Sequence, residues 1–166
     1  MARILGIDTS LRSTGLGVVA IEGNRSRAIL HRHLTMAASL SHTACLRGIG
    51  DGIREAIRET RPDAAAIEGA FFSRNARTAM ILGQARGAAL YACAAEALPV
   101  FEYAPRRVKQ AVAGFGAASK DQMQRMIQTL LALETLPQED EADALALALC
   151  HAHTRSGIPG REGKQI

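Results

Sequence analysis

Four acidic residues have the types and spacing of a divalent-cation site. Asp8 and Glu68 each close a short apolar run, and Asp140 and Asp143 stand three residues apart in a predicted helix, which places them on one face. Carboxylates gathered in one place repel and raise one another's pKa unless a cation neutralises them. Oxygen ligands favour Mg2+ or Mn2+, and two such ions about 4 Å apart promote phosphodiester hydrolysis. The pattern therefore predicts metal-assisted hydrolytic chemistry.

Each carboxylate also has a purely structural interpretation. Asp8 precedes Thr9-Ser10 and suits a turn, Glu68 suits a solvated strand end, and acidic residues in a first helical turn complement the helix dipole. Asp143 argues for more than this, because it lies where its helix becomes a run of alternating Ala and Leu. A carboxylate entering an apolar helix face needs a partner such as a cation.

A basic stretch between residues 105 and 125 offers groups for an anionic partner. Against one acidic residue, Asp121, it carries five cations: Arg106, Arg107, Lys109, Lys120 and Arg125. They suit phosphate contacts, although a solvated helix face explains them equally well. Phe71 and Phe72 are adjacent in a predicted loop, where one can stack on an exposed base and the other can anchor the loop in the core.

Composition limits the other functions. The chain has 166 residues, enough for one domain, and its net charge of +4 supports an anionic partner only weakly. The sequence contains no P-loop and no GxSxG motif, and its Cys and His residues lack the spacing of zinc ligands. Nucleotide-loop, serine-hydrolase and zinc chemistry are therefore disfavoured.

The cysteines and the apolar runs predict the compartment. Cys45, Cys93 and Cys150 sit in apolar helical patterns without CxxC spacing, so we expect buried thiols in a reducing environment. The N-terminus reads directly into a strand rather than a signal peptide, and no run of 18 uncharged apolar residues follows. A cytoplasmic protein without membrane contact is expected.

The elements that must position these residues follow from hydrophobic periodicity. Apolar runs predict five strands, over residues 3–8, 16–22, 27–34, 64–68 and 99–103. Helical spacing predicts helices over about residues 45–57, 76–98, 105–112, 120–131 and 139–153, with a capping box at Ser119 and Gln122. Three hairpin-ordered strands followed by strands alternating with helices predict an α/β fold, a five-stranded mixed sheet flanked by helices. By analogy, this order is ribonuclease H-like.

Several separated motifs resemble one known family. In chain order they are Ile4–Asp8 with Thr14-Gly15, Ile67-Glu68 with Phe71 and Asn75, Leu82–Gly87, Glu102–Pro105, Val108–Val112, Gly114 with Gly116 and Lys120, and Asp140–Ala146. Together they resemble the bacterial RuvC-type Holliday-junction resolvases over about residues 3–153. The chain departs from the family at Thr9-Ser10, which replaces the usual Pro-Gly and alters the loop after the first aspartate. Glu139 and Glu141 are additional acids beside the site.

The resemblance implies a homodimeric endonuclease that cuts four-way junction DNA symmetrically with divalent metal, Mg2+ or Mn2+, at two ions per site. It implies that the metal-binding catalytic residues are Asp8, Glu68, Asp140 and Asp143. It makes Phe71 a base-contacting residue, places Lys109 and Lys120 near the scissile phosphate, and makes a branch-migration motor a candidate partner. The helix with Leu82–Gly87 resembles the one that joins protomers. The nuclease domain is expected over residues 1–154, and residues 155–166 are expected to form a disordered basic tail.

Two other functions fit part of the pattern. An actin-like or sugar-kinase ATPase also begins with Gly-Ile-Asp and small polar residues, but it clamps nucleotide between two domains, whereas 166 residues supply one. A junction-binding scaffold without nuclease activity is compatible with the unusual Thr9-Ser10 loop. The four intact carboxylates argue against a scaffold.

Overall fold

A computed structural model of the chain describes residues 1–69, 75–155 and 163–166. Its strands are β1 (Ala2–Thr9), β2 (Ser13–Glu22), β3 (Arg25–Thr35), β4 (Ala64–Glu68), β5 (Val100–Tyr103) and β6 (Lys164–Gln165). Its helices are α1 (His42–Thr60), α2 (Ala76–Ala95), α3 (Pro105–Ala113), α4 (Lys120–Leu130) and α5 (Glu139–Arg155). Every predicted strand and helix is present, with ends that differ by a few residues.

The strands form one mixed sheet in the order β3-β2-β1-β4-β5-β6. β1 pairs antiparallel with β2, which pairs antiparallel with β3, while β1 and β4, and then β4 and β5, pair in parallel. This order confirms the ribonuclease H-like class predicted from the hairpin and the later alternation of strands and helices. In this order, β1 has the hairpin strands β2 and β3 on one side and the parallel strands β4 and β5 on the other. Ligands of α/β sheets bind at such a point, where the strand order changes direction.

The prediction of five strands is corrected to six in the described part of the chain. Lys164–Gln165 pairs antiparallel with β5, and the backbone N–H of Ile166 donates to the carbonyl oxygen of Val100 at 3.0 Å. Residues 163–166, which were expected to belong to a disordered tail, are therefore ordered along the edge of β5. That edge supplies hydrogen-bonding partners that the local sequence does not reveal. Residues 156–162 lie outside the described residues.

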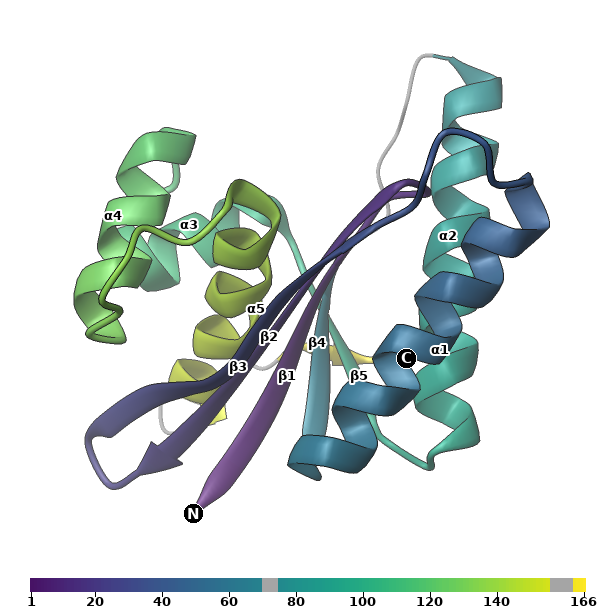
Figure 1. Cartoon of the computed structure of the whole chain (residues 1–166). Helices are drawn as coiled ribbons and strands as arrows, with labels where there is room; N and C mark the ends of the chain where they lie inside the picture. Colours follow the sequence, from purple (N-terminus) through teal and green to yellow (C-terminus); the bar gives the residue numbers. More distant parts are fainter. Residues whose placement is uncertain (70–74, 156–162) are drawn as a thin grey trace.

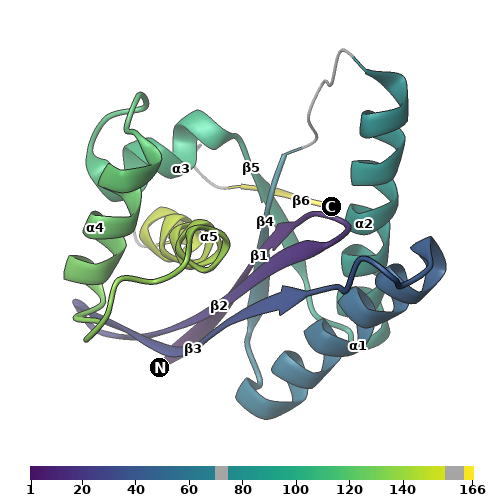
Figure 2. The same ribbon diagram turned by 45° about the horizontal axis from the view of Figure 1, so that its top comes forward.

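Helices cover both faces of the sheet (Figure 1). α1 and α2 lie together on one face, and α5, flanked by α3 and α4, lies on the other, as the turned view in Figure 2 also shows. Each side has its own apolar core, one containing Ile4, Val19 and Leu145 and the other containing Leu5, Ile7 and Ile53. The three cysteines are buried and free, as predicted. In the described residues, no helix is both long and apolar enough to span a membrane.

Two glycines allow the backbone of α5 to lie directly on the sheet. A Cβ atom at Gly6 of β1 would overlap the carbonyl oxygen of Ala144, and one at Gly15 of β2 would overlap the carbonyl oxygen of Asp140. Because Asp8 pairs with Gly15, the start of α5 rests beside the carboxyl end of β1. This close approach brings the acidic residues of α5 to the end of the sheet that carries Asp8.

Candidate active site

Asp8 and Glu68 end two adjacent strands. Ile7 of β1 is paired in parallel with Ile67 of β4, so the residues that follow them emerge side by side at the carboxyl edge of the sheet. Both side chains are half-buried. Both residues thus lie at the ends of apolar strands, as the sequence predicted, and the register sets the two strand ends beside each other.

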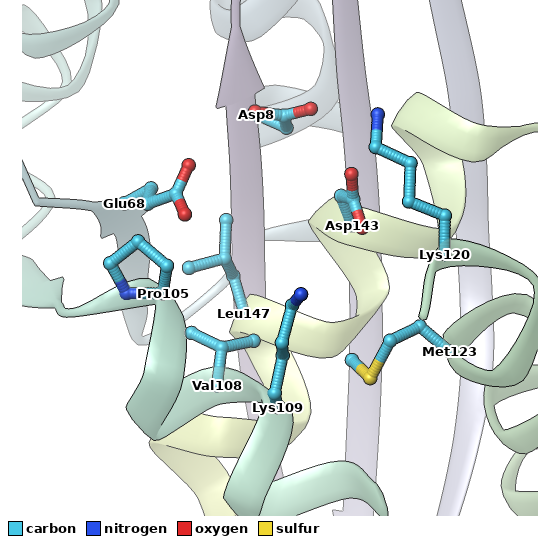
Figure 3. Close-up of a pocket in the computed structure, with 9 residues that line it drawn as sticks. All are labelled: Asp8, Glu68, Pro105, Val108, Lys109, Lys120, Met123, Asp143 and Leu147. Carbon is cyan, nitrogen blue, oxygen red and sulfur yellow. The ribbon is translucent and has the colours of Figure 1, made fainter. Parts of the chain in front are cut away.

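Asp143 adds a third carboxylate from α5, on the helical face that meets the sheet. Asp8, Glu68 and Asp143 line one pocket of about 360 Å3. The rest of its wall is mainly apolar and consists of Pro105, Val108, Met123 and Leu147, with the two lysines Lys109 and Lys120. Figure 3 shows the three carboxyl groups directed toward a common space, which the Lys109 side chain approaches from α3.

Helix starts position the two lysines. Pro105 begins α3 and places Lys109 one turn later, on the side that faces the pocket. Ser119 caps α4 through the predicted capping box with Gln122, which makes Lys120 the first residue of that helix. Two separate helices thus bring a positive charge to the pocket that the carboxylates line.

Burial and mutual repulsion perturb the titration of the pocket carboxylates. The pKa of Asp8 is raised to about 7, first by desolvation and then by the charges of Asp143, Glu68 and Asp140. The pKa of Glu68 is likewise raised to about 7 by desolvation and by Asp143, against the lowering effect of Lys109 and Lys120. Desolvation also raises the pKa of Asp143. Two lysines therefore do not neutralise the carboxylates, which favours a further cation.

Asp140 is held differently from the other three. Its Oδ2 accepts a short hydrogen bond from the hydroxyl of Ser13 and lies 3.2 Å from Nε2 of His33, while Ser13 Oγ and His33 Nε2 are 2.7 Å apart. Asp140 remains close enough for its charge to raise the pKa of Asp8 and Asp143. Sequence reasoning missed Ser13 and His33, because nothing local connects them to a residue more than a hundred positions later.

The neighbouring acids of the first turn of α5 also have partners. Glu139 forms an ion pair with Lys120, and Glu141 Oε2 lies 3.1 Å from Nδ1 of His31. The Lys120–Glu139 pair is largely exposed, so it contributes little to stability. Neither of these additional acids lines the pocket with its three carboxylates.

Arg86 supports the site from the opposite side. From α2 it donates to the carbonyl oxygen of Glu68 at 2.5 Å and forms an ion pair with Glu102 of β5, also at 2.5 Å. Arg86 lines a smaller hollow of about 200 Å3 that shares Asp8 and Glu68 with the main pocket. Arg86 is the single arginine of the motif Leu82–Gly87, and this charge among small residues was the sequence signal that could have indicated its role.

The turn after β1 is closed despite its unusual sequence. The backbone N–H and the hydroxyl of Ser10 both donate to the carbonyl oxygen of Ser13, at 3.0 and 2.6 Å, and Thr14 Oγ1 donates to the carbonyl oxygen of Ser10 at 2.9 Å. Thr9-Ser10 therefore continues into a hydrogen-bonded hairpin that keeps Asp8 at the pocket.

Two of the remaining predicted DNA contacts, Arg106 and Arg107, do not line the pocket. Arg106 is exposed on α3, with its side chain against Gly116, whereas the side chain of Arg107 hydrogen-bonds to Cys150. Phe71 and its neighbour Phe72 lie outside the described residues.

The donor set fits hard divalent cations. The acidic pocket residues offer carboxylate oxygens and no thiol or imidazole, which is the chemistry that Mg2+ and Mn2+ prefer. Within residues 1–69, 75–155 and 163–166, no three or more His, Cys, Asp or Glu side chains are grouped closely enough to hold a metal ion. Asp8, Glu68 and Asp143 nonetheless line the same pocket, where desolvation and mutual repulsion raise the pKa of Asp8 and Glu68.

Comparisons with known proteins point to one family. A family model described as crossover junction endodeoxyribonuclease RuvC matches residues 4–151. Proteins of that description from Halorhodospira halophila and Bordetella parapertussis are 51% and 50% identical, covering 94% and 91% of this chain and 93% and 83% of theirs. The solved structure of T. thermophilus RuvC in complex with Holliday junction substrate superposes with a TM-score of 0.90 at 34% identity, covering 100% of both chains.

Proposed function

The chain belongs to the RuvC family of crossover junction endodeoxyribonucleases, and on this basis we propose that Asp8, Glu68, Asp140 and Asp143 are its metal-binding catalytic residues. The protein is an endonuclease that resolves Holliday junctions, and its family depends on divalent metal. We further propose that the metal is Mg2+, which Mn2+ can replace, at two ions per site. One observation carries the proposal: carboxylates from β1, β4 and α5 share a single pocket with two lysines.

When bound, the ions supply activation of the attacking water and stabilisation of the leaving oxygen. Asp8 and Glu68, fixed on adjacent strands, provide oxygen ligands on the rigid side of the pocket. Asp143 provides another from α5, and the apolar wall around it limits access of bulk water, which strengthens every charge interaction inside.

The lysines position the DNA in this proposal. Lys109 and Lys120 line the pocket from two helices, so both can contact the phosphate that is cut or its immediate neighbour. Arg106 is exposed on the same helix as Lys109, so it extends the positive surface along the DNA backbone. Arg107 remains a proposed DNA contact from the basic stretch alone.

Two parts of the proposal are supported by the family resemblance and not by the described geometry. Phe71 is proposed to stack on a base at the junction, where pairing is interrupted. A branch-migration motor is proposed as the partner that delivers the junction. Neither proposal is needed for the pocket chemistry.

Metal binding should appear as a pH-dependent gain in stability. The folded pKa values of Asp8 and Glu68 are about 7, against ordinary values of 3.8 and 4.5, so the folded protein binds more protons between those limits. The metal-free protein should therefore lose stability as pH rises from about 4 through 7. At pH 8, Mg2+ at about 100 times its Kd should add about 2.7 kcal/mol, or about 5–10 °C in Tm. Thermal unfolding with and without Mg2+ measures both effects.

Asp8→Asn and a surface substitution control this experiment. Removing the Asp8 charge should stabilise the metal-free protein at pH 8 by about 1 to 3 kcal/mol and should abolish most of the gain from Mg2+. Asp121→Asn, the same change on an exposed residue of α4, should leave both quantities unchanged. Equal stabilisation of the wild type and Asp8→Asn by Mg2+ would argue against a metal site at Asp8.

We also propose that α2 joins two protomers. Met80, Gly83, Gly87 and Tyr91 recur at helical spacing, and all four are exposed, Met80 at 62% and Tyr91 at 74%. Nothing in the described protomer lies within 4 Å of a Cβ atom built at Gly83 or Gly87. The face thus offers two large apolar side chains around a shallow backbone strip, and a two-fold pairing of such faces would supply two active sites for two strands.

Gly87→Leu should separate the protomers without unfolding them. The space around Gly87 is open and leucine favours the helix more than glycine, so the monomer fold should be retained. Sedimentation at micromolar concentration should show a dimer for the wild type and a shift toward monomer for the variant, with weaker junction binding. Gly50→Leu, at an equally open position on α1, should stay dimeric. A wild-type monomer that cuts both strands symmetrically would contradict the proposal.

A further inference from the structure

A polar cluster outside the main pocket surrounds Asp140. Gly15 of β2 pairs across the hairpin with His33 of β3, and the backbone of Asp140 rests on Gly15. This register places the His33 ring beside the Asp140 carboxylate, while Ser13, two residues before Gly15, reaches it from the same strand. The cluster is only partly accessible, with the His33 and Asp140 side chains 25% and 28% exposed.

The hydrogen-bonding capacity of each group fixes the direction of the contacts. An ionised Asp140 can only accept, so Ser13 donates its hydroxyl proton to Oδ2. His33 presents Nε2 to both Ser13 Oγ at 2.7 Å and Asp140 Oδ2 at 3.2 Å, and its Nδ1 lies 3.3 Å from Oγ1 of Thr35. Because Ser13 gives its own proton to Asp140, its Oγ can accept from an Nε2–H of His33, and the hydroxyl of Thr35 can then donate to Nδ1.

Both contacts fall on one oxygen of the carboxylate. Oδ2 takes Ser13 and His33, whereas Oδ1 has no hydrogen bond or ion pair with the described residues. Asp140 also lies within electrostatic reach of Asp8 and Asp143. The arrangement anchors one end of the carboxylate and leaves the other oxygen available to a ligand.

We propose that Ser13 and His33 are positioning residues that hold Asp140 by Oδ2 so that Oδ1 can bind a divalent cation. This inference rests on the proposed ligand role of Asp140. Asp143 is flanked by the buried residues Ala142 and Ala144, whereas Asp140 lies in the first turn of α5 between the exposed Glu139 and the half-buried Glu141. Hydrogen bonds that orient a metal-binding carboxylate commonly change metal affinity about 10- to 100-fold when removed.

Manganese binding to the DNA-free protein tests this role without recourse to activity. In a Mn2+ titration followed by the electron paramagnetic resonance signal of free Mn2+, His33→Leu should weaken binding about 10-fold or more, and Ser13→Ala should weaken it in the same direction. His33→Gln keeps a side-chain N–H near the position of Nε2 and should restore affinity to within about 3-fold of the wild type. Rescue by glutamine but not by leucine identifies the hydrogen bond rather than packing as the cause.

His31, two residues before His33 on β3, provides a matched control. His31 contacts Glu141 at 3.1 Å in the same turn of α5, but Glu141 is not a proposed ligand, so His31→Leu should bind Mn2+ like the wild type. If His33→Leu does not fold by circular dichroism, Ser13→Ala, which removes only a hydroxyl group, decides the question. Wild-type Mn2+ affinity in both Ser13→Ala and a folded His33→Leu would overturn the clamp.

The variant Asp140→Asn distinguishes the positioning role of Ser13 and His33 from the ligand role of Asp140, on which that positioning role depends. If Asp140→Asn binds Mn2+ as tightly as the wild type, Asp140 is not a ligand and both ideas fail together. If Asp140→Asn weakens binding while the Ser13 and His33 variants do not, the ligand role stands and the positioning role alone fails. Weakened binding in all three, with His31→Leu unchanged, is the result that supports both.

Discussion

Asp143→Asn is expected to lower junction cleavage about a thousandfold while leaving junction binding nearly unchanged. Asparagine keeps the shape of the side chain but removes the charge that we propose holds metal, a loss of about 4 kcal/mol of transition-state stabilisation. The lysines that face the pocket remain, so contacts with phosphate are retained. Single-turnover cleavage in Mg2+ and fluorescence anisotropy in EDTA measure the two quantities separately.

Two further variants show whether the effect belongs to the site. Asp121→Asn makes the same change on an exposed helix surface and should cut like the wild type. Lys109→Ala should slow cleavage for a different reason, and the salt dependence of its junction binding should become shallower by about one charge. Retention of most cleavage in Asp143→Asn would count against Asp143 as a ligand.

Gly15→Ala is expected to cost both stability and activity. A Cβ atom at this position would overlap the carbonyl oxygen of Asp140, so the start of α5 must move away from β2. Overpacking of this kind typically costs about 1–3 kcal/mol of unfolding free energy, and misplacing a catalytic group by about 1 Å can cost about 100-fold in rate. Chemical denaturation and single-turnover cleavage of the folded variant test the two effects.

The control for this variant is a glycine with free space around it. Gly50 lies on α1 with nothing near its Cβ position, and Gly50→Ala should leave cleavage unchanged while stabilising the helix by up to about 1 kcal/mol. If Gly15→Ala folds and cuts as fast as the wild type, the close approach of α5 to β2 does not position the site.

The sequence predicted those parts of the structure that depend on local pattern. Asp8 and Glu68 followed apolar runs that became adjacent parallel strands, and Ser119 with Gln122 formed the expected capping box. Asp143 stood out because its carboxylate interrupts an apolar helix, and the structure places it in the pocket. These signals survive folding because strand ends, caps and helix faces are set by neighbouring residues.

Other features could not be predicted from the sequence, because they depend on how distant elements pack together. β6 forms from two polar residues because β5 offers it an edge, which no local propensity reveals. His33 lies beside Asp140 because β3 pairs with β2 in a register that sets His33 opposite Gly15, and because α5 packs directly against Gly15. Arg86 likewise acquires its role from the distance between α2 and the end of β4. Such contacts join residues far apart in the chain, so a single sequence carries little sign of them.

Cleavage of a synthetic four-way junction tests the central claim most directly. Purified protein should be incubated with the junction and with a duplex of matched sequence, each with Mg2+ and with EDTA, and the cut positions should be mapped on every strand. The account predicts paired nicks at symmetric positions in the junction, only with Mg2+, and an intact duplex. Cleavage in EDTA, equal cutting of the duplex, or junction binding with no cleavage at all would contradict it.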